Sequence, residues 1–309
     1  MLETNRTFDI RAALKQGMAQ LRAAETPSDT LAAEVLLMHT LQRDRAWLYS
    51  HPDEVLDMAV AEKYLALIAR RAAGEPTQYL TGKQEFWGLE FEVSPAVLIP
   101  RPETEHVMEV ALARLGERGL KIHLDSGAPR ETLHIADVGT GSGCLAIALA
   151  YELPHAQIVA TDISAAALEV ARRNAIRNTI PPHNITGRIQ FVEVDLLPQG
   201  TGSPFFDLIV SNPPYIADSE AASLQREVRD HEPHQALFAG PSGIEVYERL
   251  VAEARNQLRD RGILVLELGH NSAQHVQAFF DADHASWTNV SITMDLAGIP
   301  RVLAAERVR

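Results

Sequence analysis

Apolar side chains recur at helical spacing through residues 8 to 73. Three groups of positions repeat every three or four residues, and they predict three helices packed as a small bundle. The positions are Leu14, Met18 and Leu21, then Leu31, Val35, Leu36 and Met38, and later Val60, Tyr64, Leu67 and Ile68. This stretch contains no cluster of catalytic residue types, so we expect it to serve recognition of a partner rather than chemistry.

A hairpin and an extended linker are predicted next, because two short β-type runs are followed by three closely spaced prolines. The segments are strands Gln84–Trp87 and Glu90–Val93 around Gly88-Leu89, a linker with Pro95, Pro100 and Pro102, and a helix from Thr104-Glu105 to about Arg114. Arg101 stands between two prolines and is presented by a stiff backbone. By its chemistry alone, this stretch is favoured as an interdomain connector.

From residue 133 onward, apolar strand-like runs alternate with amphipathic or apolar helices, which predicts an open α/β sheet. The strands are Leu133–Val138, Gln157–Thr161, Arg188–Val194, Phe205–Val210, Ile263–Glu267, Val290–Met294 and Arg301–Ala305, and the helices are Cys144–Tyr151, Ala165–Asn178, Ile244–Arg259 and Ser272–Asp281. Residues 116–132 are polar and predict a loop. Residues 217–240 predict an irregular segment that is long enough to be a lid.

The strand Phe205–Val210 stops abruptly at Ser211-Asn212-Pro213-Pro214-Tyr215. Two consecutive prolines have no N–H to donate, so they form a stiff turn at the carboxyl end of the strand, where open α/β sheets bind ligands. The Asn212 side-chain oxygen and the Pro213 carbonyl can accept the two N–H donors of a planar –NH2 group, and Tyr215 can stack on its plane. This turn resembles the (N/D/S)-P-P-(Y/F) motif of methyltransferases acting on amide or base nitrogens. The alternative is a rigid turn without chemistry.

A glycine-rich loop, Gly139-Thr140-Gly141-Ser142-Gly143, joins a predicted strand to an apolar helix. The dinucleotide fingerprint requires glycine where Cys144 stands, so it fails. Asp137 and the three glycines instead meet D-x-G-x-G-x-G, which resembles the first motif of Rossmann-like methyltransferases that bind S-adenosylmethionine. Asp137 can attract the cofactor's ammonium group, and the helix N-terminus favours its carboxylate. Another nucleotide, or a plain tight turn, is the competing interpretation.

Two further strand ends carry candidate cofactor contacts. Asp162 follows the second strand of the sheet, 19 residues past Gly143, where an acidic side chain can accept hydrogen bonds from both ribose hydroxyls. The competing role at this place is an N-cap of the next helix, for which Asp162 or Ser164 would serve. Asp195 and Leu196 end the third strand and would border the adenine, with Asp195 accepting from its amino group and Leu196 packing on the ring.

Charge and composition narrow the partners. The 309 residues carry 41 acidic and 28 basic side chains, a net charge of −13, which argues against a broad nucleic-acid-binding face. One cysteine, Cys144, excludes an intrachain disulfide and favours a reducing compartment. Residues 1–10 lack a signal-peptide pattern, and no apolar run approaches the roughly 20 residues of a membrane span. We therefore expect a soluble cytoplasmic protein. His231 and His234 flank Glu232-Pro233 without a third ligand nearby, so we predict no metal site.

Five segments together resemble the HemK/PrmC family, the glutamine methyltransferases of peptide-chain release factors. They are GEPTQYLTGKQEFWGLEFEVSPAVLIPRPETE from Gly74, DVGTGSGCLAIALA from Asp137, SNPPYI from Ser211, HEPHQALFAGPSGIEVYERL from His231 and DLAGIPRVL from Asp295. The match runs from about Gly74 to the C-terminus, with a weaker helical resemblance before it. The loop at 116–132 looks longer than is usual in the family.

The resemblance implies a Rossmann-like class I methyltransferase: a seven-stranded sheet with an antiparallel last strand, a small helical N-terminal domain and a β-hairpin linker. We place the helical domain at 1–76, the hairpin and linker at 77–102 and the methyltransferase domain at 103–309. The family resemblance implies that S-adenosylmethionine lies along Gly139–Gly143, Asp162 and Leu196. It also implies that Asn212, Pro213 and Tyr215 hold the glutamine amide of a class-one release factor, in its Gly-Gly-Gln loop, and we expect a monomer.

Three rival functions share parts of this pattern. A sister family methylates a glutamine of a ribosomal protein and shares NPPY, although the PRPETE segment favours the release-factor branch. An adenine-amino DNA methyltransferase shares the turn chemistry, but the charge of −13 opposes it. An inactive cofactor-binding partner protein would show the same sheet.

Overall fold

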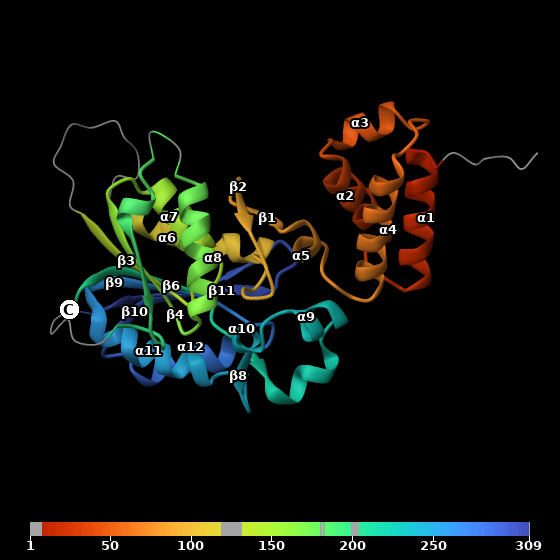
Figure 1. Cartoon of the computed structure of the whole chain (residues 1–309). Helices are drawn as coiled ribbons and strands as arrows, with labels where there is room; N and C mark the ends of the chain where they lie inside the picture. The colour runs from red at the N-terminus through yellow and green to blue at the C-terminus, as the bar shows by residue number, and fades with distance from the viewer. Residues whose placement is uncertain (1–7, 119–131, 180, 182, 199–203, 309) are drawn as a thin grey trace, which may run out of the picture. The chain divides into compact units, whose positions relative to one another are not determined.

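The computed structural model describes residues 8–118, 132–179, 181, 183–198 and 204–308. The chain divides into two compact units, which Figure 1 shows together. The first unit contains residues 1–83 together with 225–231, and the second contains 84–224 and 232–309. In the part of the chain that the structure describes, no helix is long and apolar enough to cross a membrane.

The first unit is a helical bundle with its own apolar core. Its helices are α1 (Ile10–Ala23), α2 (Asp29–Leu41), α3 (Arg45–Ser50), α4 (Met58–Ala72), α5 (Thr77–Thr81) and α9 (Arg226–His231). The three helices predicted from periodicity correspond to α1, α2 and α4, whose side chains Leu21, Leu36 and Ile68 are fully buried. The prediction missed α3, a single short helix whose start is fixed because the Asp44 carboxylate accepts from the Trp47 N–H at 2.7 Å.

A β-hairpin opens the second unit, one residue earlier in register than predicted. Its strands are β1 (Lys83–Phe86) and β2 (Leu89–Glu92), and its turn is Trp87-Gly88 rather than Gly88-Leu89. Both turn residues have positive φ, +53° and +70°, as a two-residue hairpin turn that matches strand twist requires. The Asn174 side chain exchanges two hydrogen bonds with the Glu92 backbone, at 2.6 and 2.9 Å, and so fixes the hairpin to the following domain.

The second unit contains a seven-stranded sheet in its described residues, as predicted. The strand order is β10-β11-β9-β6-β3-β4-β5, and β11 runs antiparallel to both neighbours. The strands are β3 (Leu133–Val138), β4 (Ala156–Asp162), β5 (Ile189–Glu193), β6 (Phe206–Ser211), β9 (Leu258–Glu267), β10 (Trp287–Met294) and β11 (Pro300–Arg307). The sheet helices are α6 (Glu105–Glu117), α7 (Cys144–Glu152), α8 (Ala165–Arg177), α11 (Glu245–Gln257) and α12 (Ala273–Ala282).

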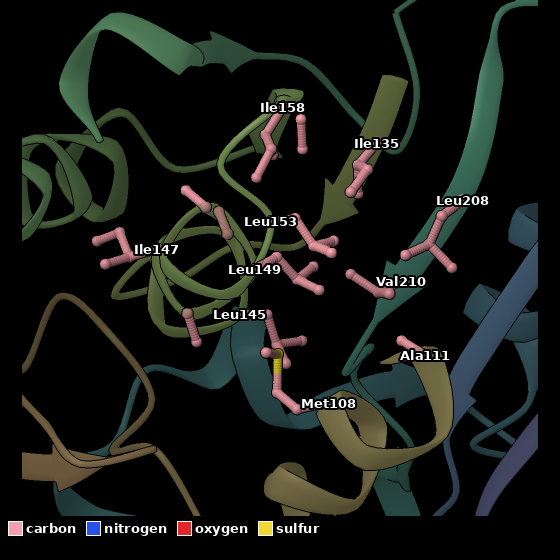
Figure 2. Close-up of a cluster of buried hydrophobic side chains, with 14 of the residues drawn as sticks. Met108, Ala111, Ile135, Leu145, Ile147, Leu149, Leu153, Ile158, Leu208 and Val210 are labelled. Atoms are coloured by element: carbon pink, nitrogen blue, oxygen red, sulfur yellow. The ribbon is translucent and has the colours of Figure 1, made fainter. Parts of the chain in front are cut away.

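Both faces of this sheet are covered by helices (Figure 1). On one face, Ile135, Leu208 and Val210 pack against α6 and α7, and Figure 2 shows these side chains meeting Met108, Leu145 and Leu149. On the other face, the alternate residues of the same strands pack against α11 and α12. Strands that are buried on both faces have continuous apolar sequences, and this pattern made the strands recognisable in the sequence.

The segment after NPPY is more regular than predicted. Residues 217–240, expected to be irregular, contain β7 (Ile216–Ala217), the 3-10 helix η3 (Asp218–Ser223), α9, α10 (His234–Leu237) and β8 (Phe238–Gly240). Two pairings that the sequence does not reveal explain this order. Ile216 pairs with Phe238 in a short parallel ladder, and the Glu220 carboxylate accepts from the Ala217 N–H at 3.1 Å. Residues 119–131 of the predicted loop lie outside the described residues.

The buried face of α7 provides a stability test. Leu149→Ala removes a side chain that is fully buried between α7 and the sheet, so the free energy of unfolding should fall by roughly 2–5 kcal/mol. Ile176→Ala, at a position 67% exposed on α8, is the control and should change it by less than about 0.5 kcal/mol. Urea denaturation followed by circular dichroism measures both, and equal effects of the two variants would contradict the assignment of this core.

Candidate functional site

A cavity opens at the carboxyl ends of β3, β4, β5 and β6. It is open to solvent and lies where open α/β sheets bind their ligands. Its wall consists of Ala96, Val97, Leu98, Val138, Gly139, Gly141, Asp162, Ile163, Ser164, Ala167, Val194, Leu196, Ser211, Asn212, Pro213, Pro214, Pro233, Gln235, Ala236 and Val246. Seven of the predicted site residues are therefore brought to one cavity: Gly139, Gly141, Asp162, Leu196, Asn212, Pro213 and Pro214.

The glycine loop forms one side of this cavity. Gly139 has φ +71°, and a Cβ built on it would meet no atom within 4 Å, so the place that a side chain would take is open space at the wall. Gly143 serves a different purpose, because a Cβ there would lie 3.1 Å from both Ala171 Cβ and Ile147 Cδ1. Gly139 thus leaves room for a ligand, whereas Gly143 lets α7 and α8 pack closely.

Asp137 lies beneath the loop rather than in the cavity wall. Its Oδ2 accepts from Thr140 Oγ1 at 2.6 Å and from the Ala146 N–H at 3.0 Å, which ties the loop to the first turn of α7. Burial raises the pKa of this carboxyl to about 7. Thr140, Ser142 and Gly143 are likewise outside the wall. These four residues shape the loop, and their predicted contacts with a cofactor stay predictions.

Asp162 faces the cavity in a fixed orientation. Its Oδ2 accepts from the Gly141 N–H and its Oδ1 from the Ser164 N–H, each at 2.9 Å. Burial raises its pKa above the ordinary value. The cap of α8 is Ser164, whose hydroxyl accepts from the Ala167 N–H at 3.2 Å. Capping therefore does not require Asp162, and each of its oxygens retains lone pairs for a ligand.

The two predicted residues after β5 point to different surroundings. Leu196 has φ +64° and lies in the cavity wall, where the Thr161 hydroxyl holds its carbonyl at 2.7 Å. Asp195 is outside the wall, and its half-exposed carboxylate pairs with Arg249 at 2.5 Å. The predicted contact of Asp195 with an adenine stays a prediction.

The NPPY turn follows β6, the neighbour of β3 that leads into the glycine loop, and Asn212, Pro213 and Pro214 all line the cavity. Asn212 Nδ2 donates to Thr104 Oγ1 at 3.1 Å, so this bond leaves the amide oxygen Oδ1 as an acceptor. Tyr215 is not in the wall. Its ring packs against Gly269, where an added Cβ would lie 2.8 Å from Tyr215 Cδ2, and burial raises the pKa of its phenol.

Two stretches of the wall were missed by sequence reasoning. Ala96–Leu98 come from the linker, and Pro233, Gln235 and Ala236 from the segment after α9. They are tied together because Arg101 forms an ion pair with Glu232, a buried carboxylate that also accepts from the Ile99 N–H at 3.4 Å. The stiffly held Arg101 was the available sign in the sequence that the linker takes part in the site, but its partner Glu232 lies 131 positions away. No group of three or more possible metal ligands occurs among the described residues.

Comparison with known proteins gives two family matches. Residues 12–82 match the PrmC N-terminal domain, and residues 117–231 match the methyltransferase small domain. The release factor glutamine methyltransferase of Koribacter versatilis is 42% identical over 96% of this chain and 98% of its own. The enzyme of the same name from Chlorobaculum tepidum is 41% identical over 94% and 95%.

Solved structures agree with the fold. The hMettl16 catalytic domain in complex with MAT2A 3′UTR hairpin 1 aligns with a TM-score of 0.54 at 16% identity, covering 98% of this chain and 94% of that one. At this identity, the likeness concerns the fold alone. The relatives that align over almost the whole chain establish the family. Their shared name, release factor glutamine methyltransferase, favours none of the three rival functions. The chain belongs to the family of release factor glutamine methyltransferases.

Proposed function

We propose that this enzyme transfers a methyl group from S-adenosylmethionine to the side-chain amide nitrogen of the glutamine in the Gly-Gly-Gln loop of class-one release factors. One observation carries the proposal. Asn212 stands in the wall of the same cavity as Gly139 and Asp162, with its Nδ2 already bonded to Thr104. An amide acceptor and the candidate cofactor contacts thus line one cavity.

The wall fits S-adenosylmethionine at several points. The open space at Gly139 lets the methionine part lie against the loop, and the two backbone-oriented oxygens of Asp162 suit the two ribose hydroxyls. Leu196 and Ile163 supply apolar surface for the adenine ring. Asp195 is a candidate acceptor for the adenine amino group, although it would share its carboxylate with Arg249. The cofactor supplies an electrophilic methyl group on its sulfonium.

The NPPY turn is proposed to orient the nucleophile. An amide nitrogen is weakly nucleophilic because its lone pair is delocalised into the carbonyl, so the attack depends on alignment. Asn212 Oδ1 and the Pro213 carbonyl accept the two N–H groups of the glutamine amide and hold its nitrogen in line with the methyl group. The same two oxygens stabilise the positive charge that develops on nitrogen.

The proton has no evident acceptor in the protein at this turn. Asp162 is the only carboxylate among the described residues that line the cavity. Its two oxygens already accept from the Gly141 and Ser164 N–H groups. We propose that the proton leaves to water after methyl transfer. Tyr215 packs against Gly269 outside the wall, and its predicted stacking on the plane of the substrate amide stays a prediction.

We propose that the helical domain, residues 1–76, recognises the release factor. Four large hydrophobic side chains of this bundle are more than half exposed, Leu31 at 54%, Val55 at 56%, Tyr49 at 59% and Met58 at 76%. Apolar side chains left in solvent are frequent contacts for a protein partner.

Asp162 gives the first test. Asp162→Ala should weaken S-adenosylmethionine binding by roughly 1–3 kcal/mol, because the ribose hydroxyls would lose buried acceptors. Asp162→Asn keeps the shape and one acceptor oxygen, and should lose less. Isothermal titration calorimetry measures both, and unchanged affinity in the alanine variant would remove Asp162 from the cofactor site.

Asn212 gives the second test. Asn212→Ala removes one oriented acceptor, so methyl transfer should fall by at least ~100-fold while cofactor affinity changes little. Mass spectrometry of tryptic peptides should place the methyl group on the glutamine of the Gly-Gly-Gln loop. A release factor with alanine at that glutamine is the control and should stay unmodified. Activity within a few-fold of the unmodified enzyme would show that the proposed alignment is wrong.

The exposed apolar side chains give the third test. Met58→Ala or Leu31→Ala should raise KM for a whole release factor by about tenfold where the side chain is a main contact. The same variants should methylate a short Gly-Gly-Gln peptide as the parent enzyme does. If neither variant nor Val55→Ala changes KM for the whole factor, this surface is not where the partner binds.

A further inference from the structure

Three residues from separate elements meet behind the NPPY turn. Asn212 follows β6 and Glu267 ends β9, two parallel strands that lie side by side with Ser211 opposite Leu266. Thr104 ends the 3-10 helix Pro102–Thr104 that leads into α6. Neither Thr104 nor Glu267 lines the cavity, and both are almost fully buried, at 2% and 3% exposure.

A directed hydrogen-bond chain joins them. The Thr104 hydroxyl donates to the Glu267 carboxylate, and the Thr104 oxygen accepts from Asn212 Nδ2 at 3.1 Å. A hydroxyl has one proton, so while it is given to Glu267, Oγ1 presents lone pairs alone to Asn212. Only the –NH2 side of the Asn212 amide can then face Thr104.

We propose that Thr104 and Glu267 are positioning residues that lock the side-chain amide of Asn212 with its oxygen toward the substrate. The inference rests on the proposed role of Asn212 as an acceptor. If the Asn212 amide rotated by half a turn, its –NH2 group would face the –NH2 group of the glutamine. Two donors that face each other cannot form a hydrogen bond. The chain therefore decides which end of Asn212 the substrate meets.

The environment of the Glu267 carboxylate supports a functional role for its charge. Its Oε2 is buried and has no hydrogen-bond partner among the described residues, an arrangement that contributes nothing to stability. The pKa of Glu267 is raised to about 7, because burial and the nearby Glu103 raise it more than Thr104, Arg301 and Arg101 lower it. Burial, with a smaller effect of the Glu267 charge, raises the pKa of Tyr215, Tyr247 and Cys144, which stay neutral near pH 7.

Thr104→Val tests the chain with a variant of nearly the same shape. It removes the hydroxyl, so kcat for methyl transfer should fall by about 10- to 100-fold, as for loss of alignment, while Kd for S-adenosylmethionine stays unchanged. Thr104→Ser restores the hydroxyl and should recover most of kcat. If the valine variant keeps full kcat, or if serine fails to rescue it, the inference is wrong.

A double-mutant cycle separates positioning from a general structural effect. In an Asn212→Ala background there is no amide left to orient, so adding Thr104→Val should cause no further loss of kcat. Losses that multiply would overturn this inference and leave the proposed function intact. Full activity of Asn212→Ala alone would instead overturn the proposed role of Asn212 as an acceptor, on which this inference rests, and a methyl group found elsewhere than on the glutamine would overturn the proposed function. Should Thr104→Val fail to fold, Thr104→Ala, which also removes the hydroxyl, takes its place in the same cycle.

The pH dependence provides a separate readout. Because ionised Glu267 holds the hydroxyl proton most firmly, kcat should fall as the pH drops through about 7 and this carboxyl takes up a proton. Asp137 also has a pKa raised to about 7, so the parent profile alone does not identify the group. Glu267→Gln keeps an acceptor oxygen but cannot titrate, and it should flatten the part of the profile that Glu267 causes. An unchanged profile in this variant would overturn the role of Glu267.

Discussion

Burial of the central sheet on both faces is the constraint on which the rest of this structure depends. Helices α6 and α7 cover one side and α11 and α12 the other, so β3 and β6 have no free face for polar chemistry. Functional side chains can stand only where strands end. The carboxyl ends of the parallel strands provide the glycine loop, Asp162, Leu196 and the NPPY turn at one edge, and the cavity forms there.

Three buried carboxylates hold this edge together, each by a different arrangement. Asp137 ties the glycine loop to α7, and Glu232 joins the linker at Ile99 and Arg101 to a segment remote in sequence. Glu267 holds Thr104 behind the turn. Burying a carboxylate costs free energy unless its oxygens are bonded, and Asp137 Oδ1 and Glu267 Oε2 have no hydrogen-bond partner among the described residues. Together they give the loops of the site the rigidity of the sheet that carries them.

The sequence was most informative where chemistry and local pattern coincide. Three of the apolar strands flanking the site, β3, β4 and β6, were predicted to within one residue, and Asp162 and Asn212 were located because each directly follows such a strand. Contacts between distant segments were not predictable. Nothing local pairs Arg101 with Glu232 or Thr104 with Glu267, and the hairpin turn shifted to Trp87-Gly88 because backbone twist, rather than the position of the glycine, decides it.

The site is better suited to orienting a neutral amide than to activating it by removing a proton. Asn212 and Pro213 line the wall, their amide and carbonyl oxygens are the acceptors that we propose for the substrate, and consecutive prolines provide no N–H donors that would compete for them. A carboxylate at this position would also accept from the substrate, but it would be costly to keep ionised in a largely apolar pocket. Neutral acceptors avoid that cost, yet an asparagine has two nearly isosteric ends and accepts from one of them alone. An asparagine that accepts from a substrate therefore depends on the residues behind it, and we propose that the bond from Asn212 Nδ2 to the Thr104 hydroxyl oxygen makes that selection here.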